Sequence, residues 1–213
     1  MICNIEVIKI LDRIGDKIIE EKDFLTELDR PIGDNDHGIN MAKGFTEVKK
    51  VFETWEENET TENQELGSVF KTVGMTLVSK VGGSSGPLYG TAFMKMGMLL
   101  GGKKEMSFPE FLAAFQAGVE GVGQRGRSTT EEKTMLDAMV PALNAMKEAY
   151  EADKDVKAAF TAGVKAAEAG VEHTKDLIAT KGRASYVGER GIGHQDPGAT
   201  SFTMMLQTAE KYL

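Results

Sequence analysis

Three aspartates lie within eight residues of one another near the start of the chain, at Asp29, Asp34 and Asp36. Carboxylates this close repel one another unless a cation lies between them. Their hard oxygen atoms select Mg²⁺ or Ca²⁺ over softer metals. A hydrophilic turn uses the same residue types, so this segment alone leaves a metal site and a solvated turn both open.

Two common kinds of metal site do not fit the sequence. An EF-hand loop needs a closing Glu at its twelfth position, but that position is Phe45 counted from Asp34 and Asn40 counted from Asp29. A di-iron helical bundle needs Glu-x-x-His pairs, and the chain contains none. A magnesium site therefore remains the metal hypothesis for the three aspartates.

Glycine and serine are concentrated in the segment Gly82-Gly83-Ser84-Ser85-Gly86-Pro87. Its backbone N–H groups and hydroxyls suit a phosphate group, aided by the positive end of the helix dipole that follows. The segment is not a Walker A motif, because no Gly-Lys-Ser/Thr follows. A flexible helix connection has the same composition, so the signal is weak by itself.

Two further segments add hydrogen-bond donors. Gly126-Arg127-Ser128-Thr129-Thr130 precedes a helix, and the long segment 182–198 carries Arg183, Arg190 and His194. Arginines bind phosphate oxygens in a bidentate manner, whereas a lone histidine is more often structural. Carboxylates, backbone donors and arginines together predict a magnesium–nucleotide site for phosphoryl transfer, which mostly requires charge neutralisation and alignment.

Helices must position these segments, since the apolar residues recur with helical spacing. Ile8, Leu11 and Ile18 define the first such stripe, and Ser107 with Glu110 has the spacing of a capping box. No stretch has a convincing strand pattern. The sequence predicts an all-α protein of about eight helices, over residues 4–20, 38–55, 64–80, 87–101, 107–123, about 133–150, about 154–180 and 199–212.

Short connections favour antiparallel neighbours in an up-and-down array. In such an array, alternate connections lie at the same end. The four chemically unusual segments, 29–37, 81–86, 124–132 and 182–198, are alternate connections. We therefore expect all four to meet at one end of the molecule.

Composition narrows the class of protein. The chain has 213 residues, a formal net charge of −8 and a single cysteine, Cys3. It has no basic cluster to displace counterions from nucleic acid, no signal-peptide pattern at the N-terminus and no apolar stretch long enough to span a membrane. We expect a single domain over residues 1–213 that is located in the cytoplasm and binds neither nucleic acid nor membranes.

Five segments stand out in order along nearly the whole chain. They are Gly33-Asp34-Asn35-Asp36-His37-Gly38, Gly82 to Thr91, Lys133-Thr134-Met135-Leu136-Asp137, Gly182-Arg183-Ala184-Ser185-Tyr186 and Gly193 to Ser201. As an ordered set they resemble the nucleotide-binding L subunits of bacterial dihydroxyacetone kinases, and they equally resemble the C-terminal nucleotide domains of the single-chain ATP-dependent kinases. The resemblance implies a barrel of eight antiparallel helices, capped at one end by the nucleotide.

The resemblance also implies a division of labour among subunits. The L subunit holds ADP or ATP with two Mg²⁺ ions, and a separate K subunit holds dihydroxyacetone. In the phosphotransferase-system version, ADP stays bound as a coenzyme and a phosphohistidine-carrying M subunit re-phosphorylates it. In some systems the L subunit also acts on a transcriptional regulator.

Carried over by position, the resemblance implies Mg²⁺ ligands at Asp29, Asp34 and Asp36. It implies that Ser84 and Ser85 donate hydrogen bonds to the β- and γ-phosphates, and that Arg183 contacts a phosphate. The remaining nucleotide contacts that it implies are His37, Gly38, Asn40, Met41, Gly126, Thr130, Met135, Asp196, Pro197 and Gly198.

The resulting hypothesis is the nucleotide-binding subunit of a dihydroxyacetone kinase, with ADP as a bound coenzyme. Two alternatives are an ATP-dependent subunit for another small ketose or triose, and a nucleotide-gated regulatory module that binds a transcription factor. The substrate is selected on the other subunit, so this sequence does not separate the first two.

Overall fold

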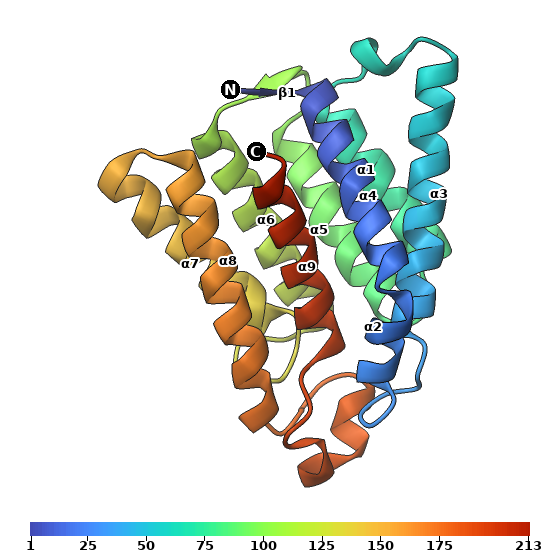
Figure 1. The fold of residues 1–213 in the computed structure, drawn as a ribbon, viewed down its shortest axis with the longest axis vertical. Helices are drawn as coiled ribbons and strands as arrows, with labels where there is room; N and C mark the ends of the chain where they lie inside the picture. The colour runs from blue at the N-terminus through green and yellow to red at the C-terminus, as the bar shows by residue number, and fades with distance from the viewer.

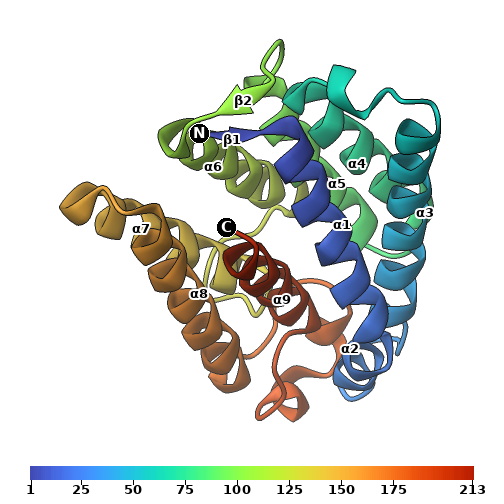
Figure 2. The ribbon, with the colours of Figure 1, turned by 45° about the horizontal axis from the view of Figure 1, so that its top comes forward.

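Eight long helices form a closed ring in the computed structural model, which describes residues 1–213 (Figures 1 and 2). Each long helix packs against the next one along the chain, and the last packs against the first. The eight helices are α1 (Asn4–Glu20), α3 (His37–Glu57), α4 (Leu66–Lys80), α5 (Ser85–Leu99), α6 (Phe108–Gly126), α7 (Leu136–Asp153), α8 (Val156–His173) and α9 (Pro197–Lys211). The predicted all-α class and up-and-down barrel are confirmed.

Local sequence signals set where several helices begin. Ser107 and Glu110 form the predicted capping box at the start of α6, where Ser107 Oγ accepts from Glu110 N. At α9, Asp196 caps the helix by accepting a 2.7 Å hydrogen bond from Ala199 N, and Pro197 occupies the first turn. These caps satisfy N–H groups that the helix itself leaves unpaired.

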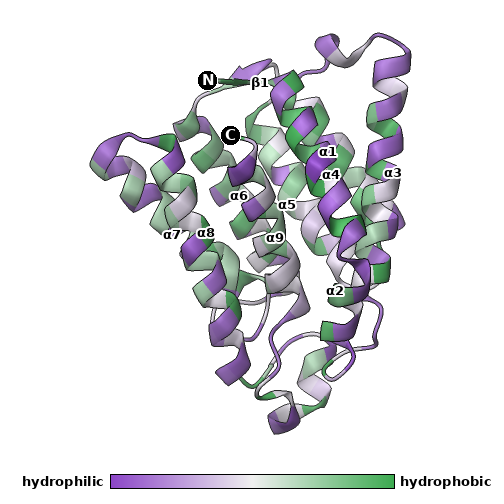
Figure 3. Cartoon of the chain, in the orientation of Figure 1, coloured by the Kyte–Doolittle hydropathy of each residue, from purple (hydrophilic) through white to green (hydrophobic).

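The apolar faces of the helices meet in one cluster of 42 buried residues, which includes Ile18, Phe45, Leu77 and Met146. Figure 3 shows hydrophobic and hydrophilic residues alternating along the helices, as expected when each helix buries only one face. Glycine brings α4 and α5 unusually close, because a Cβ on Gly74 would lie 2.7 Å from the carbonyl oxygen of Gly90.

The four unusual connections do meet at one end, the lower end in Figure 1. We call them the first loop (30–36), the second loop (81–84), the third loop (127–135) and the fourth loop (174–196). The fourth loop contains three short 3-10 helices, η2 (Thr174–Asp176), η3 (Arg183–Tyr186) and η4 (Gly188–Gly191).

Both chain termini lie at the other end of the ring. There an apolar cavity of about 460 Å³ opens between the helices.

The structure differs from the predicted elements in four places. A short helix, α2 (Lys22–Asp29), precedes the first loop, where no separate helix is predicted. Helix α8 ends at His173 rather than near residue 180. Strands β1 (Ile2–Cys3) and β2 (Glu105–Met106) form a small antiparallel pair, and a 3-10 turn, η1 (Thr61–Asn63), precedes α4. None of the helices combines the length and the apolar character needed to cross a membrane.

Candidate functional site

Residues from all four loops line one cavity of about 890 Å³ at the loop end of the ring. Its lining is mainly polar, in contrast to the apolar cavity at the other end. Acidic groups come from the first loop, and hydroxyls and glycines come from the second. The third and fourth loops add basic side chains. The folding of the ring therefore brings together residues that are up to about 170 positions apart in the sequence.

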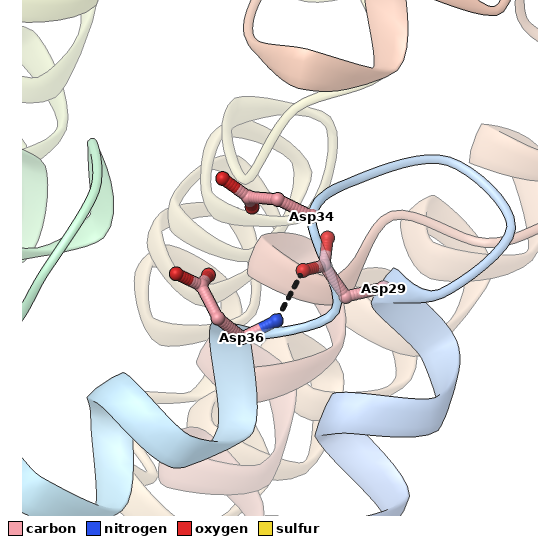
Figure 4. Close-up of side chains that lie close together, drawn as sticks. All are labelled: Asp29, Asp34 and Asp36. Carbon is pink, nitrogen blue, oxygen red and sulfur yellow. Dashed lines mark hydrogen bonds between the residues drawn. The ribbon is translucent and has the colours of Figure 1, made fainter.

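Asp29 at the end of α2 and Asp34 and Asp36 of the first loop point toward a common space (Figure 4). One carboxylate oxygen from each of Asp29, Asp34 and Asp36 lies within 4.8 Å of the others. Asp29 is buried, whereas Asp36 is half-buried and Asp34 is exposed. Burial raises the pKa of the Asp36 carboxyl, and the neighbouring Asp34 and Asp29 carboxylates raise it further. A divalent cation would remove this repulsion, so the donor set fits Mg²⁺.

Backbone contacts hold Asp29 in place for this role. Its Oδ2 accepts hydrogen bonds from Asp36 N at 3.0 Å and from His37 N at 3.3 Å. Asn35 adopts a left-handed conformation with φ of 61°, which turns the chain back toward α2. A Cβ on Gly33 would collide with the Asp29 carboxylate, so only glycine leaves that side chain its position.

Several helix N-termini surround the same cavity. The lining includes His37 at the start of α3, Ser85 at the start of α5, Pro197 at the start of α9 and Met135 just before α7. Each N-terminus carries partial positive charge and N–H groups without helical partners. Phosphate groups bind at such positions, so the cavity combines groups that suit an anion with aspartates that suit a cation.

His37 is buried between two hydroxyl groups. Its Nδ1 lies 3.1 Å from Ser85 Oγ, and its Nε2 lies 3.0 Å from Ser201 Oγ. Burial lowers the pKa of His37 to about 4. The imidazole is therefore neutral near pH 7 and adds hydrogen bonding, not charge, to the site.

The fourth loop crosses the cavity and contacts the first loop. The Arg183 Nε lies 3.0 Å from Asp34 Oδ2. Lys181, Arg183 and Tyr186 line the cavity from this loop, and Arg125 lines it from α6. At the end of the loop, burial raises the pKa of Asp196 to about 7.

Lys133 is a functional candidate to which the sequence analysis assigned no role, although it begins one of the five segments that carry the family resemblance. Its side chain is almost fully buried, and its Nζ donates to the carbonyl oxygens of His194 at 2.6 Å, Leu177 at 3.2 Å and Thr174. An ammonium group bonded to three carbonyls ties the fourth loop to the third. No sequence signal marks this role, because lysine is mostly exposed in proteins.

Most of the predicted nucleotide and metal contacts line the cavity, and four do not. Asn40 lies just behind it, since a Cβ on Gly82 would lie 2.7 Å from Asn40 Oδ1. Met41 is fully buried in the core, Gly38 packs against the backbone of α2, and Thr130 lies in the third loop outside the lining. The predicted contacts that do line the cavity are Asp29, Asp34, Asp36, His37, Ser84, Ser85, Gly126, Met135, Arg183, Asp196, Pro197 and Gly198.

Comparison with known proteins identifies related chains. The DAK2 domain family matches residues 31–211. The "PEP-dependent dihydroxyacetone kinase 1, ADP-binding subunit DhaL" of Listeria innocua is 46% identical over 202 residues, which cover 93% of each chain. The corresponding Escherichia coli subunit is 40% identical, over 95% of this chain and 93% of its own.

A solved structure shares the fold. The dihydroxyacetone kinase of C. freundii, crystallised with AMP-PNP and Mg²⁺, superposes with a TM-score of 0.72 at 23% identity. The match covers 96% of this chain and 33% of that one. The extent of the family match and the identity to the two bacterial subunits together show that this chain belongs to the DAK2 domain family, as a relative of the ADP-binding subunits of dihydroxyacetone kinases.

Proposed function

We propose that the protein is the ADP/ATP-binding subunit of a dihydroxyacetone kinase, a phosphotransferase. One observation carries the proposal: three clustered carboxylates, one of them at the N-terminus of α3, line a single cavity together with the N-termini of α5 and α9. That arrangement suits a Mg²⁺-bound polyphosphate. The Listeria innocua and Escherichia coli relatives are named as ADP-binding subunits of such kinases.

In this proposal, Asp29, Asp34 and Asp36 hold the metal. Magnesium bound there would bridge phosphate oxygens and neutralise charge that develops during transfer. Three carboxylates are enough to hold two Mg²⁺ ions, which is the number that the family resemblance implies. Asp29 is fixed by two backbone N–H groups, so its position does not depend on the metal.

The remaining lining divides into a phosphate side and an apolar side. Ser84, Ser85 and the start of α5 donate to the terminal phosphates, and Arg183 adds a positive charge. Gly126 lies against Leu88, since a Cβ on Gly126 would be 3.4 Å from Leu88 Cδ2. Met135 lines the same cavity, and the apolar atoms of these residues would suit the base and ribose.

Phosphoryl transfer requires a second subunit, which we propose to be a dihydroxyacetone-binding K subunit docked against the loop end. Arg190 and His194 of the fourth loop are exposed there. We further propose that ADP remains bound and is re-phosphorylated by a phosphohistidine-carrying M subunit in the cytoplasm. The same loop end would also serve for action on a transcriptional regulator.

Native mass spectrometry of the purified protein, with no nucleotide added, tests the coenzyme role. Retained ADP with two Mg²⁺ ions is the expected result. An empty protein that binds ATP reversibly would instead indicate an exchanging, ATP-dependent subunit. If neither nucleotide binds in the presence of Mg²⁺, the proposed function is wrong.

Reconstitution tests the reaction. The protein is combined with a K subunit and dihydroxyacetone, and with either a phosphohistidine donor or ATP, and dihydroxyacetone phosphate is measured. Product from the phosphohistidine donor is expected. If neither donor yields product although the nucleotide binds, a purely regulatory role replaces the enzymatic one.

One observation favours the ketose alternative as the second candidate. An L-erythrulose 1-kinase of Mycolicibacterium smegmatis is 26% identical over 99% of this chain, which spans 36% of that protein. Because the other subunit selects the substrate, the reconstitution must use this protein's own K subunit, and adding erythrulose to it then distinguishes the two substrates. Faster phosphorylation of erythrulose than of dihydroxyacetone would favour this candidate.

A further inference from the structure

A chain of buried polar groups runs from the core to the cavity wall behind the second loop. Tyr89 Oη lies 2.7 Å from Ser201 Oγ, which lies 3.0 Å from His37 Nε2. On the other side of the imidazole, His37 Nδ1 lies 3.1 Å from Ser85 Oγ. Tyr89 and Ser201 are at most 2% exposed, whereas Ser85 lines the cavity.

The hydrogen atoms of this chain have two consistent arrangements, because a neutral imidazole has one N–H. With the hydrogen on Nε2, His37 donates to Ser201 and must accept the hydroxyl hydrogen of Ser85 at Nδ1. With the hydrogen on Nδ1, His37 donates to Ser85 and accepts from Ser201. Tyr89 has an acceptor in either case, since its hydroxyl also donates to Gly198 O at 2.9 Å.

The two arrangements differ in what Ser85 offers to the cavity. Phosphate oxygens accept hydrogen bonds and do not donate them. In the Nε2–H arrangement the single hydrogen of Ser85 is held by His37, so Ser85 presents only lone pairs to a phosphate. In the Nδ1–H arrangement that hydrogen is free to point into the cavity.

We propose that Ser201, buried in α9, is a positioning residue that stabilises the Nδ1–H form of His37 and thereby frees the Ser85 hydroxyl to donate to a nucleotide phosphate. Ser201 does this by giving its hydrogen to Nε2 at 3.0 Å rather than to Gly198 O at 3.1 Å, because Nε2 would otherwise be a buried acceptor without a partner. This inference rests on the proposed function, because it requires a phosphate at Ser85.

Nitrogen-15 NMR of the imidazole tests the relay in the unsubstituted protein. The chain has only three histidines, and His37→Gln identifies the signal. In the presence of Mg²⁺ and ADP, the expected signature has Nδ1 protonated and Nε2 unprotonated. An Nε2–H tautomer or a doubly protonated ring in that complex would overturn the proposal.

A double-mutant cycle tests whether Ser201 acts through Ser85. Ser201→Ala is expected to weaken Mg²⁺–ADP binding about tenfold, as for one buried hydrogen bond. In a Ser85→Ala background, the same change is expected to weaken it less than about twofold, because the donor it positions is gone. Equal losses in both backgrounds would show that Ser201 acts only on the fold.

Thr203→Val is the matched control on the same helix. It also removes a buried hydroxyl, but Thr203 Oγ1 donates only to the carbonyl oxygen of Ala199 in its own helix. Its Mg²⁺–ADP affinity should stay unchanged. Absence of Mg²⁺–ADP binding in the unsubstituted protein overturns the proposed function together with the relay, whereas binding with the Nε2–H tautomer overturns the relay alone.

Discussion

The Arg183 Nε lies 3.0 Å from the Asp34 carboxylate, which joins the fourth loop to the first. The pair links a predicted phosphate contact to a predicted metal ligand. Both side chains are substantially exposed, 68% for Arg183 and 43% for Asp34, so the ion pair adds little to stability. The pair therefore separates at low cost when a metal takes Asp34 and a phosphate takes Arg183.

This pairing predicts opposite effects of Arg183→Gln on two ligands. Binding of Mn²⁺ to the nucleotide-free protein should strengthen, because Asp34 no longer has a competing cation. Binding of Mg²⁺–ADP should weaken about tenfold with the loss of a charge-assisted hydrogen bond. Titration calorimetry measures both affinities.

Arg190→Gln is the control for Arg183→Gln, since Arg190 is also exposed in the fourth loop but does not line the cavity. It should leave nucleotide affinity unchanged and reduce transfer to the K subunit. If Arg183→Gln lowers both the Mn²⁺ and the Mg²⁺–ADP affinities, the exchange of partners is wrong.

Asp34→Asn should weaken Mg²⁺–ADP binding by at least about tenfold, because a charged metal ligand is lost. The circular dichroism spectrum should not change, since Asp34 is exposed. Asp23→Asn is the control, because it makes the same change in charge on α2 at a side chain that is 91% exposed. This variant should bind Mg²⁺–ADP as tightly as the unsubstituted protein does. Unchanged binding in Asp34→Asn would contradict the metal role.

Lys133→Met should loosen the fourth loop. The change leaves the carbonyls of Thr174, Leu177 and His194 without their donor, which we expect to cost about 1–3 kcal/mol in the free energy of unfolding. Hydrogen exchange should quicken at Gly193 N, which bonds to Lys175 O at 2.7 Å in the same loop.

Lys181→Met is the comparison for Lys133→Met, because Lys181 belongs to the same loop but its side chain is 37% exposed. Its exchange rates and unfolding should match those of the unsubstituted protein. If Lys133→Met leaves exchange in the fourth loop unchanged, the anchoring role is wrong.

The raised pKa of the Asp196 carboxyl should make the stability of the fold depend on pH. Burial raises its pKa to about 7 in the folded protein, whereas an unfolded Asp has a pKa of about 4. The folded state therefore binds the proton more tightly, and the free energy of unfolding should fall as the pH rises from about 4 to about 7.

Asp196→Asn keeps a residue that caps helices but does not titrate. Urea denaturation at several pH values should show the fall in the unsubstituted protein and a shallower slope in the variant. Parallel slopes in the two proteins would show that Asp196 is not the group responsible.

Local sequence signals alone determined much of the helical ring. The apolar spacing of Ile8, Leu11 and Ile18 predicts α1 correctly, and the Ser107 capping box predicts the start of α6. Such signals are short-range, because side chains three or four positions apart share a helix face and a cap bonds within one turn. The convergence of the four loops also followed from the sequence, since antiparallel neighbours place alternate connections at one end.

Only the tertiary structure decided the contacts between distant elements. Helix α8 ends at His173, and the carbonyl oxygen of the next residue, Thr174, accepts a hydrogen bond from Lys133. The spacing of residues in the sequence does not predict that contact. Likewise, Ser201 meets His37 across 164 positions. Chain closure and side-chain packing fix such pairs, so the sequence could single out the three clustered aspartates but not the contacts of Lys133 and Ser201.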